Sequence, residues 1–542
     1  MNIILIVSIV LFWAAGFLSY FLNIKKYIHI MQLEGYKNRQ FFYWLSKNLK
    51  DSIIWPSGIF LVLIIIYFSG LYLYWDSYLF IPLILGFVPL SLFYIYQYIK
   101  KKFKKPLVYT PRLIRLLIAN ILLFIIEILI VLNTPSIATS FSSKAVLWFG
   151  LALVLTPFNV ILSNVIVYPL ERSIQKYYIN SAARKILSMK DLINIGITGS
   201  FGKTSTKFIL KTILSEKYKV LATPDSYNTT MGTTRVIREI LNDVHEVFIS
   251  EMGARNIGDI AEICNIVKPD MAIITSIGKQ HLETFKTINN VAKTKYELIK
   301  GLKEDGTGFF PSDNDYCYEL YKGTTKKKVL YGLEKHIEEV DITAEDVVLS
   351  DKGSTFVLTG RDGKKIECTT KLLGKHNVLN ILGCAAIAKY LGMTMEEIAD
   401  GVSKIEPIPH RLQILSAQNG TIVIDDAFNS NPVGSKMALE VLSRFKGRKI
   451  IVTPGMVELG SEEFDLNKDF GREIAKVVDI AVLVGKKRTE AIQQGLVQEG
   501  FSQDNLHVVN SLDEATVKLA AFVRSGDIIL FENDLPDNYD EN

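Results

Sequence analysis

Five long apolar stretches before residue 170 constrain the fold of this chain more than any other feature of its sequence. A helix needs ~20 apolar residues to cross the hydrocarbon core of a bilayer, and each stretch comes close to that length. The stretches cover residues 3–22, 53–75, 78–96, 114–132 and 145–168. Hydrophobic residues make up 49% of the chain, and their excess lies almost entirely in this part. We therefore expect an α-helical membrane domain of about five transmembrane helices over residues 1–175.

Basic residues in the connecting loops predict how these helices are oriented. The loops after the first and the third stretch are rich in Lys and Arg, whereas the connection Asn133–Ser143 contains neither. Loops rich in Lys and Arg stay on the cytoplasmic side of a membrane. The sequence thus predicts a multi-pass protein of the cell membrane, with the N-terminus outside and everything after Leu170 in the cytoplasm.

One acidic residue, Glu127, lies within the fourth apolar stretch. A carboxyl group is costly in hydrocarbon, so we expect it to face protein or water. A hydrogen bond between helices and a contact with a lipid substrate both fit this residue.

Charge and cysteine content bear on the class of partner and of site. The net charge of +5 over 542 residues gives no argument for a nucleic-acid partner. Four cysteines are scattered over the part after residue 170, with spacings typical of neither a zinc site nor a redox pair. We expect reduced, buried thiols in a cytoplasmic domain.

After Leu192 the pattern changes to short apolar strands that alternate with amphipathic helices. Such alternation is typical of a doubly wound α/β sheet. The strands expected first are Ile193–Thr198, Val247–Glu251 and Met271–Thr275, with a helix over Thr204–Glu216. A second α/β unit has expected strands at Ile422–Asp425, Lys449–Thr453, Ile480–Val484 and Ile528–Phe531. This pattern gives a central domain over 190–408, with an inserted β element at 340–370, and a C-terminal domain over 409–542.

A glycine-rich loop, GITGSFGKTS at residues 196–205, follows the first strand of the central domain. Glycines let the backbone wrap a phosphate, and the next helix offers free N–H groups and its positive dipole end. Lys203 can neutralise the β- and γ-phosphate oxygens, and the Thr204 hydroxyl can hold Mg²⁺. Ile197 stands where a general P-loop has glycine, so the loop has the more restricted form G-x-T-G-x-x-G-K-T. The expected ATP-binding residues here are Gly199, Ser200, Gly202, Lys203, Thr204 and Ser205.

Three residues further along could complete a site for phosphoryl transfer, which needs the phosphate charge spread over metals and cations. Glu251 ends one strand, His281 follows the next, and Lys295 lies on a helix. The carboxyl ends of neighbouring parallel strands meet near a bound nucleotide. Each residue also has an ordinary interpretation, as a strand-end charge, a packed loop histidine or a solvated helix lysine.

Together these motifs resemble the central domain of the Mur ligase family, and most of all the branch that adds D-alanyl-D-alanine. The segments that carry the resemblance are Ala222–Pro224, Asn228–Gly232, Glu251–Ala254, His281–Glu283 and Ala292–Glu297, beside the P-loop. The resemblance implies ATP and two Mg²⁺ ions, with Thr204, Glu251 and His281 as metal ligands. It also implies that Lys295 is carbamylated and that its new carboxylate steadies the second ion. The catalytic residues would be Lys203, Glu251, His281 and Lys295.

Further segments extend the resemblance over about residues 190–530. They are Gly374–Asn380, Pro409–Leu412, the run DDAFNSNP at 425–432 and Gly455–Gly460. The segment Gly374–Asn380 implies that Asn377 approaches the nucleotide. The next two segments imply the same for Arg411 and Asp426. The fold implied is a P-loop central domain followed by a Rossmann-like, substrate-binding C-terminal domain. The residues expected to face the substrates are Asn228, Thr229, Thr230, Asn429, Asn431 and Glu458.

The sequence departs from the family pattern at two places. Mur ligases begin with a soluble domain that grips a UDP-sugar, and here the apolar stretches stand in its place. The D-alanyl-D-alanine branch has a Lys-Gly-Ser element after its last strand, where this chain has Glu532, Asn533 and Asp534. Acidic side chains there would repel a substrate carboxylate.

The reaction expected is ATP plus a carboxylic acid plus an amine, giving an amide, ADP and phosphate through an acyl phosphate. The expected partners are the bilayer, an amine donor and a small-molecule or lipid-linked carboxylate of peptidoglycan or envelope synthesis. One alternative is a polyglutamate-type ligase that makes a secreted or lipid-attached polymer. Another, of a different class, is a transporter or sensor that uses the P-loop domain as a switch. The second-metal residues and the DDAFNSNP run argue against that class and against an inactive scaffold.

Overall fold

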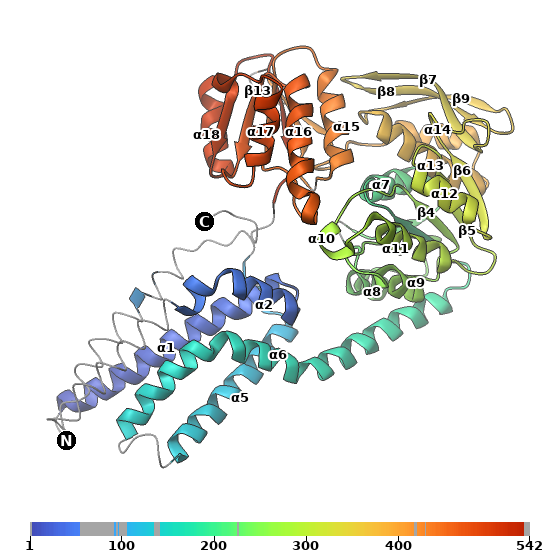
Figure 1. Cartoon of the computed structure of the whole chain (residues 1–542). Helices are drawn as coiled ribbons and strands as arrows, with labels where there is room; N and C mark the ends of the chain where they lie inside the picture. Colours follow the sequence, from blue (N-terminus) through green and yellow to red (C-terminus); the bar gives the residue numbers. More distant parts are fainter. Residues whose placement is uncertain are drawn as a thin grey trace. The chain divides into compact units, whose positions relative to one another are not determined.

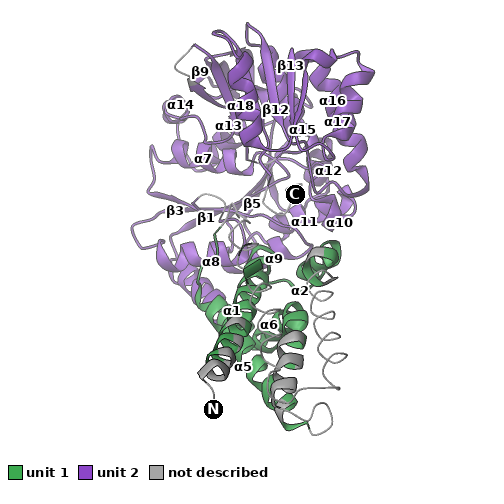
Figure 2. Cartoon of the chain, turned by 90° about the vertical axis from the view of Figure 1, so that its left-hand side faces the viewer, with its two compact units in different colours: residues 1–176 green, residues 177–542 purple. Residues whose placement is uncertain are grey.

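The chain forms two compact units, residues 1–176 and 177–542 (Figure 2). The structure, a computed structural model, describes residues 3–54, 92–93, 96, 106–134, 141–224, 227–416, 420–428 and 430–535.

The described part of the first unit is helical. Its elements are α1 (Ile3–Leu33), α2 (Asn38–Lys47), η1 (Lys50–Ile54), α5 (Pro111–Asn133) and α6 (Phe141–Ser188). Side chains from α1, α2, α5 and α6 pack into one apolar cluster, which includes Tyr27, Phe41, Phe124 and Trp148. On α5, Glu127 is partly buried near Asn159 of α6, whose buried amide nitrogen has no hydrogen-bond partner among the described residues.

Two helices among the described residues, Pro111–Val131 and Leu151–Ser188, are long and apolar enough to cross a membrane. They overlap the expected fourth and fifth stretches. The expected first stretch lies within α1, several of whose side chains are not described, and the stretches 53–75 and 78–96 fall almost wholly outside the described residues. The described part of the chain therefore contains two apolar spans of this kind where the sequence predicts five.

The central part of the second unit is built on a nine-stranded sheet in the order β2-β3-β1-β4-β5-β6-β7-β8-β9 (Figure 1). Its parallel strands are β1 (Ile193–Thr198), β2 (Val220–Ala222), β3 (Val247–Glu251), β4 (Met271–Ile274), β5 (Thr307–Pro311) and β6 (Lys327–Tyr331). The expected inserted element is an antiparallel extension made of β7 (Ile342–Ser350), β8 (Gly353–Gly360) and β9 (Lys365–Thr370). β1 and β3 are buried almost throughout, as expected for parallel strands covered on both faces.

Helices cover both faces of this sheet (Figure 1). One face packs against α7 (Lys203–Leu214), α13 (Lys375–Tyr390) and α14 (Met395–Ser403). The other packs against α8 (Thr230–Glu239), α9 (Asp259–Val267), α11 (Ile288–Lys300) and α12 (Asp315–Gly323), and the short α10 (Leu282–Phe285) follows β4. The four cysteines of the chain are free thiols buried in these two layers.

The C-terminal part has a six-stranded sheet in the order β10-β11-β15-β12-β13-β14, parallel except for β10. Its strands are β10 (Gln413–Ser416), β11 (Ile422–Asp426), β12 (Lys449–Thr453), β13 (Ile480–Val484), β14 (Leu506–Val509) and β15 (Ile528–Glu532). The helices α15 (Pro432–Ser443), α16 (Glu463–Val477) and α17 (Glu490–Gln498) pack in one apolar cluster, and α18 (Leu512–Phe522) packs in a second. The short 3₁₀ turns are η2 (Gly460–Glu462) and η3 (Gln503–Asn505). All four strands expected here are present.

Candidate active site

The glycine-rich loop connects β1 to α7 and is shaped to hold an anion. Gly202 caps α7 with a φ of +81°, and a Cβ there would lie 2.9 Å from the Asn380 side-chain oxygen, so only glycine fits. The backbone N–H of Ser200 donates to the Ser276 carbonyl at 2.9 Å, which anchors the loop to the segment after β4. The Lys203 ammonium donates to the Gly199 carbonyl at 2.6 Å. The loop thus places a cation and the positive end of α7 at one point.

Glu251 lies at the carboxyl end of β3, in register with Ile197 of β1, and is 1% exposed. One carboxylate oxygen, Oε1, accepts from the Thr204 hydroxyl at 3.2 Å and from the Asn228 amide at 3.1 Å. The other, Oε2, lies 2.9 Å from the ammonium of the buried Lys207. Burial raises the pKa of Glu251, but the charges of Lys207 and Lys203 outweigh this and hold it below its ordinary value.

The oxygen atoms of Thr204 and Glu251 are a donor set that suits Mg²⁺. The sequence analysis missed Lys207, although a signal was available. It follows Lys203 and Thr204 by one turn of α7, so it shares their face of the helix.

Lys295 is buried on α11, with 2% of its surface exposed. This position excludes the interpretation as a solvated helix lysine. Burial, and next the charge of Lys203, lower its pKa well below the ordinary value. Within the part of the chain that the structure describes, its ammonium group has no hydrogen bond or ion pair. Both effects favour the neutral amine.

His281 precedes α10 and meets the C-terminal domain. Its Nδ1 is hydrogen-bonded to Oε2 of Glu458, which follows β12. The other oxygen of Glu458 lies 3.3 Å from the Arg255 guanidinium. Burial lowers the pKa of His281, although Glu458 acts in the opposite direction. Glu458, expected to face a substrate, instead contacts a candidate metal ligand, and the sequence analysis missed Arg255 altogether.

A second cluster brings together the expected nucleotide residues of the C-terminal domain. The Arg411 guanidinium lies 4.4 Å from the centre of the Phe428 ring. Asp426 accepts from the Leu412 N–H at 3.3 Å, and burial raises its pKa to about 6 although Arg411 opposes this. Asn377, also expected to approach the nucleotide, belongs to the central domain, where it is buried on the first turn of α13 and donates to the Leu373 carbonyl at 2.9 Å.

Several residues expected to face the substrates make local contacts. Thr229 caps α8 by accepting from the Gly232 N–H at 3.2 Å. The Thr230 hydroxyl donates to Glu262 at 2.7 Å. Asn431 caps α15 by accepting from two backbone N–H groups. Asn429 lies outside the described residues.

Glu532, the last residue of β15, is one of the acidic residues expected to repel a substrate carboxylate. It is buried, with 2% of its surface exposed, and accepts hydrogen bonds from Ser430 and, at 2.7 Å, from Thr453. Burial raises its pKa to about 7, against these hydrogen bonds. Glu532 is thus part of the interior behind the DDAFNSNP run.

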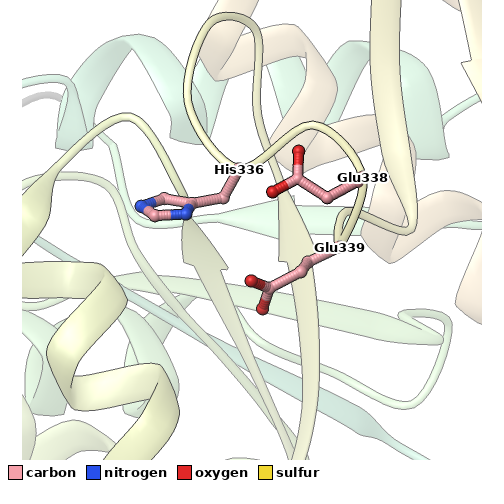
Figure 3. Close-up of side chains that lie close together, drawn as sticks. All are labelled: His336, Glu338 and Glu339. Atoms are coloured by element: carbon pink, nitrogen blue, oxygen red, sulfur yellow. The ribbon is translucent and has the colours of Figure 1, made fainter.

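A separate group of His336, Glu338 and Glu339 lies on the loop between β6 and β7 (Figure 3). His336 stacks on the Tyr318 ring at 3.7 Å, and the Tyr318 hydroxyl donates to Glu339 at 2.7 Å. Both glutamates are exposed, and the contacts with Tyr318 account for the arrangement.

Comparisons with known proteins agree with this geometry. The Mur ligase middle domain family matches residues 197–388, and the family described as Mur ligase, glutamate ligase domain matches residues 410–532. The chain is 30% identical over 342 residues to the UDP-N-acetylmuramoyl-tripeptide–D-alanyl-D-alanine ligase of Bacillus subtilis, covering 62% of this chain and 72% of that protein. It is 28% identical to the Escherichia coli ligase of the same name, covering 54% of this chain and 64% of that protein.

Solved structures show the same similarity. A crystal structure of MurF from Acinetobacter baumannii superposes with a TM-score of 0.61 and 25% identity, covering 67% of this chain and 78% of that one. The MurF ligase of Thermotoga maritima in complex with ADP gives a TM-score of 0.59 and 25% identity, with 66% and 80% covered. The chain therefore belongs to the Mur ligase family and is an ATP-dependent acid–amino acid ligase.

Proposed function

We propose that this enzyme joins an amine to a carboxylate of a peptidoglycan or envelope precursor, in the manner of the D-alanyl-D-alanine-adding ligases to which it is similar. The observation that carries the proposal is the geometry around Glu251. At the carboxyl end of β3, its carboxylate accepts from the Thr204 hydroxyl of the P-loop at 3.2 Å and lies 2.9 Å from the Lys207 ammonium. Groups arranged in this way can neutralise a polyphosphate and an anionic acyl group together.

In the proposed reaction, an oxygen of the substrate carboxylate attacks the γ-phosphorus, and the bond to ADP breaks. The amine nitrogen then attacks the acyl carbon, phosphate leaves and the nitrogen loses a proton. Lys203 and the first turn of α7 hold the phosphates, while Asn377, Arg411 and Asp426 orient the nucleotide. Mur ligases use ATP and Mg²⁺, and bound Mg²⁺ would offset the negative charge that the phosphates carry. Thr204, Glu251 and His281 are the proposed metal ligands.

Lys295 is proposed to act as its carbamate. Only a neutral amine attacks carbon dioxide, and the lowered pKa of this buried group favours that form. Carbamylation would replace the buried amine near Lys203 with an anion, which the Lys203 ammonium would stabilise. Lys293, the exposed neighbour on the same helix, lacks this environment.

The apolar helices support a proposal for localisation. Pro111–Val131 and Leu151–Ser188 fit membrane spans, and we infer a multi-pass domain over 1–175 that keeps the domains 190–408 and 409–542 in the cytoplasm. A membrane-embedded ligase would meet a lipid-linked carboxylate at the bilayer surface. Short epitope tags test the orientation. In intact cells a tag inserted in the connection Asn133–Ser143 should react with an antibody, and a tag after Asn542 should react only after permeabilisation.

The substrates can be identified with detergent-purified protein, ATP and pairs of candidate compounds. The carboxylates to test are UDP-linked and lipid-linked muramyl peptides, and the amines are D-alanyl-D-alanine, single amino acids and glutamate. Phosphate release that requires both members of a pair, with the amide product seen by mass spectrometry, would support the proposal. Turnover with glutamate alone as the amine, adding several residues in succession, would replace it with a polyglutamate ligase. ATP hydrolysis that no pair stimulates would contradict both.

A further inference from the structure

His281 and Glu458 face each other across the two α/β domains, and both have left-handed backbone conformations. The φ angle of His281 is +50° and that of Glu458 is +64°. Such angles are uncommon for residues with a Cβ, and they persist where the surroundings fix them. A backbone hydrogen bond from Glu283 N–H to the Glu458 carbonyl, at 3.2 Å, ties the two segments together. Both side chains are therefore presented by constrained backbone.

The contact between the side chains is specific in its atoms. Glu458 Oε2 bonds to Nδ1 of His281, while Oε1 lies 3.3 Å from Arg255, so both ends of the carboxylate are held. The two side chains are 17% and 19% exposed. A carboxylate that accepts from Nδ1–H keeps the proton of a neutral imidazole on that nitrogen and leaves the lone pair on Nε2. Nε2 is then the atom free to bind a metal.

We propose that Glu458 is a positioning residue, which sets the tautomer and ring orientation of His281 so that Nε2 can bind the second Mg²⁺. This inference rests on the proposed role of His281 as a metal ligand. It replaces the expectation that Glu458 faces a substrate.

The origin of the two residues gives the contact a further consequence. His281 belongs to the central domain and Glu458 to the C-terminal domain. Lys279 and Glu462 make a second contact between the same segments at 2.5 Å. The side chain that contacts the proposed metal ligand therefore comes from the other domain.

Manganese binding to the full-length protein in detergent, with ADP present, tests this proposal without relying on activity. Electron paramagnetic resonance titration gives the affinity of each Mn²⁺ site, and electron spin-echo modulation detects a nitrogen atom bound to the metal. The variants are Glu458→Ala and Glu458→Gln. Glu462→Gln is the matched control, because it removes a charge from the same segment and breaks only the Lys279 contact. Gel filtration and thermal unfolding show whether each variant is folded.

Glu458→Ala should weaken the second Mn²⁺ site by about 10- to 100-fold and reduce the nitrogen modulation, while the first site is unchanged. Glu458→Gln should lie between Ala and wild type, because its amide oxygen can still accept from Nδ1–H. Glu462→Gln should stay within about twofold of wild type, because exposed ion pairs contribute little. Undiminished nitrogen modulation in Glu458→Ala, or an equal loss in Glu462→Gln, would overturn the positioning role.

His281→Ala separates this inference from the function on which it rests. Loss of the second site in His281→Ala together with an intact site in Glu458→Ala would leave the proposed metal site standing and remove only the role of Glu458. An intact second site in His281→Ala would show that this histidine is not a ligand, and both claims would fall together.

Discussion

The two α/β domains bury different kinds of ionisable group. In the central domain, Lys203, Lys207 and Lys295 gather around the carboxylate of Glu251. In the C-terminal domain, the carboxyl group of Glu532 is buried, and the partly buried Asp426 lies near Arg411. Two similar sheets are therefore accompanied by different buried groups, which are mainly lysines in the central domain and carboxyl groups in the C-terminal domain.

In both domains, burial shifts the pKa of these groups towards neutral pH. Burial lowers the pKa of Lys203 to about 8 and raises that of Glu532 to about 7, so each domain holds groups that change protonation near neutral pH. The central domain offers positive charge to a polyphosphate. The C-terminal domain instead contains carboxyl groups, Asp426 and Glu532, whose protonated form is favoured by burial.

The largest effect is expected for Lys203→Ala, which removes the cation at the β- and γ-phosphates. Turnover should fall by about 10³-fold, because this interaction strengthens as charge moves in the transition state. Coupled-enzyme measurement of phosphate release checks this, with Lys211→Ala on the exposed last turn of α7 as the control. If the purified Lys203→Ala protein turned over at the wild-type rate, the charge of Lys203 would not be needed for the reaction.

Variants of Lys295 distinguish a carbamate from an unmodified lysine at this position. Lys295→Ala should slow turnover roughly 10²- to 10³-fold, and Lys295→Arg should fail equally because it restores charge of the wrong sign. Added formate or acetate should restore part of the rate of Lys295→Ala. The exposed Lys293→Ala is the matched control and should stay near wild type. An active Lys295→Arg enzyme would refute the carbamate.

Glu532 tests whether the C-terminal domain carries the cost of a buried acid. Because the folded-state pKa, about 7, lies above the ordinary 4.5, the folded state binds the proton more tightly than the unfolded state. The contribution of the protonated Glu532 to the free energy of unfolding is fully present below pH 4.5. It is lost as the pH rises from 4.5 through about 7, by up to about 3 kcal/mol. Glu532→Gln should flatten this fall in the thermal midpoint between pH 5 and 8. Equal pH dependence in both proteins would show that Glu532 ionises without cost.

Asp426 should give the smallest effect. Its pKa of about 6 predicts that the ionised fraction, and with it kcat/KM, falls roughly tenfold from pH 7 to pH 5. In Asp426→Asn this acid limb should disappear, because no carboxyl group remains to be protonated. A pH profile of kcat/KM for ATP checks the prediction, and an acid limb that survives in the variant must come from another group.

Local patterns were enough to predict the central domain. The P-loop, its helix and the strand-end positions of Glu251 and His281 follow from short spacings, and the expected strands form with nearly the expected bounds. The contacts between domains could not be predicted in this way. The contact of His281 with Glu458 joins residues 177 positions apart. The burial of Glu532 could not be predicted either, because nothing in its own segment indicates the contacts with Ser430 and Thr453. The burial of Lys295 could be recognised only from the fold, because a lysine on an amphipathic helix usually faces solvent.

The buried thiols have a practical consequence for studying motion between the domains. Cys264, Cys317, Cys368 and Cys384 are the only cysteines of the chain, and burial raises the pKa of each thiol. Protonated, inaccessible thiols react slowly with maleimides and peroxides. A pair of cysteines introduced on the surfaces of α16 and α9 could therefore carry fluorescent dyes while the native four remain in place. Energy transfer between such dyes would report any change in the separation of the two domains, in a chain that keeps its natural interior.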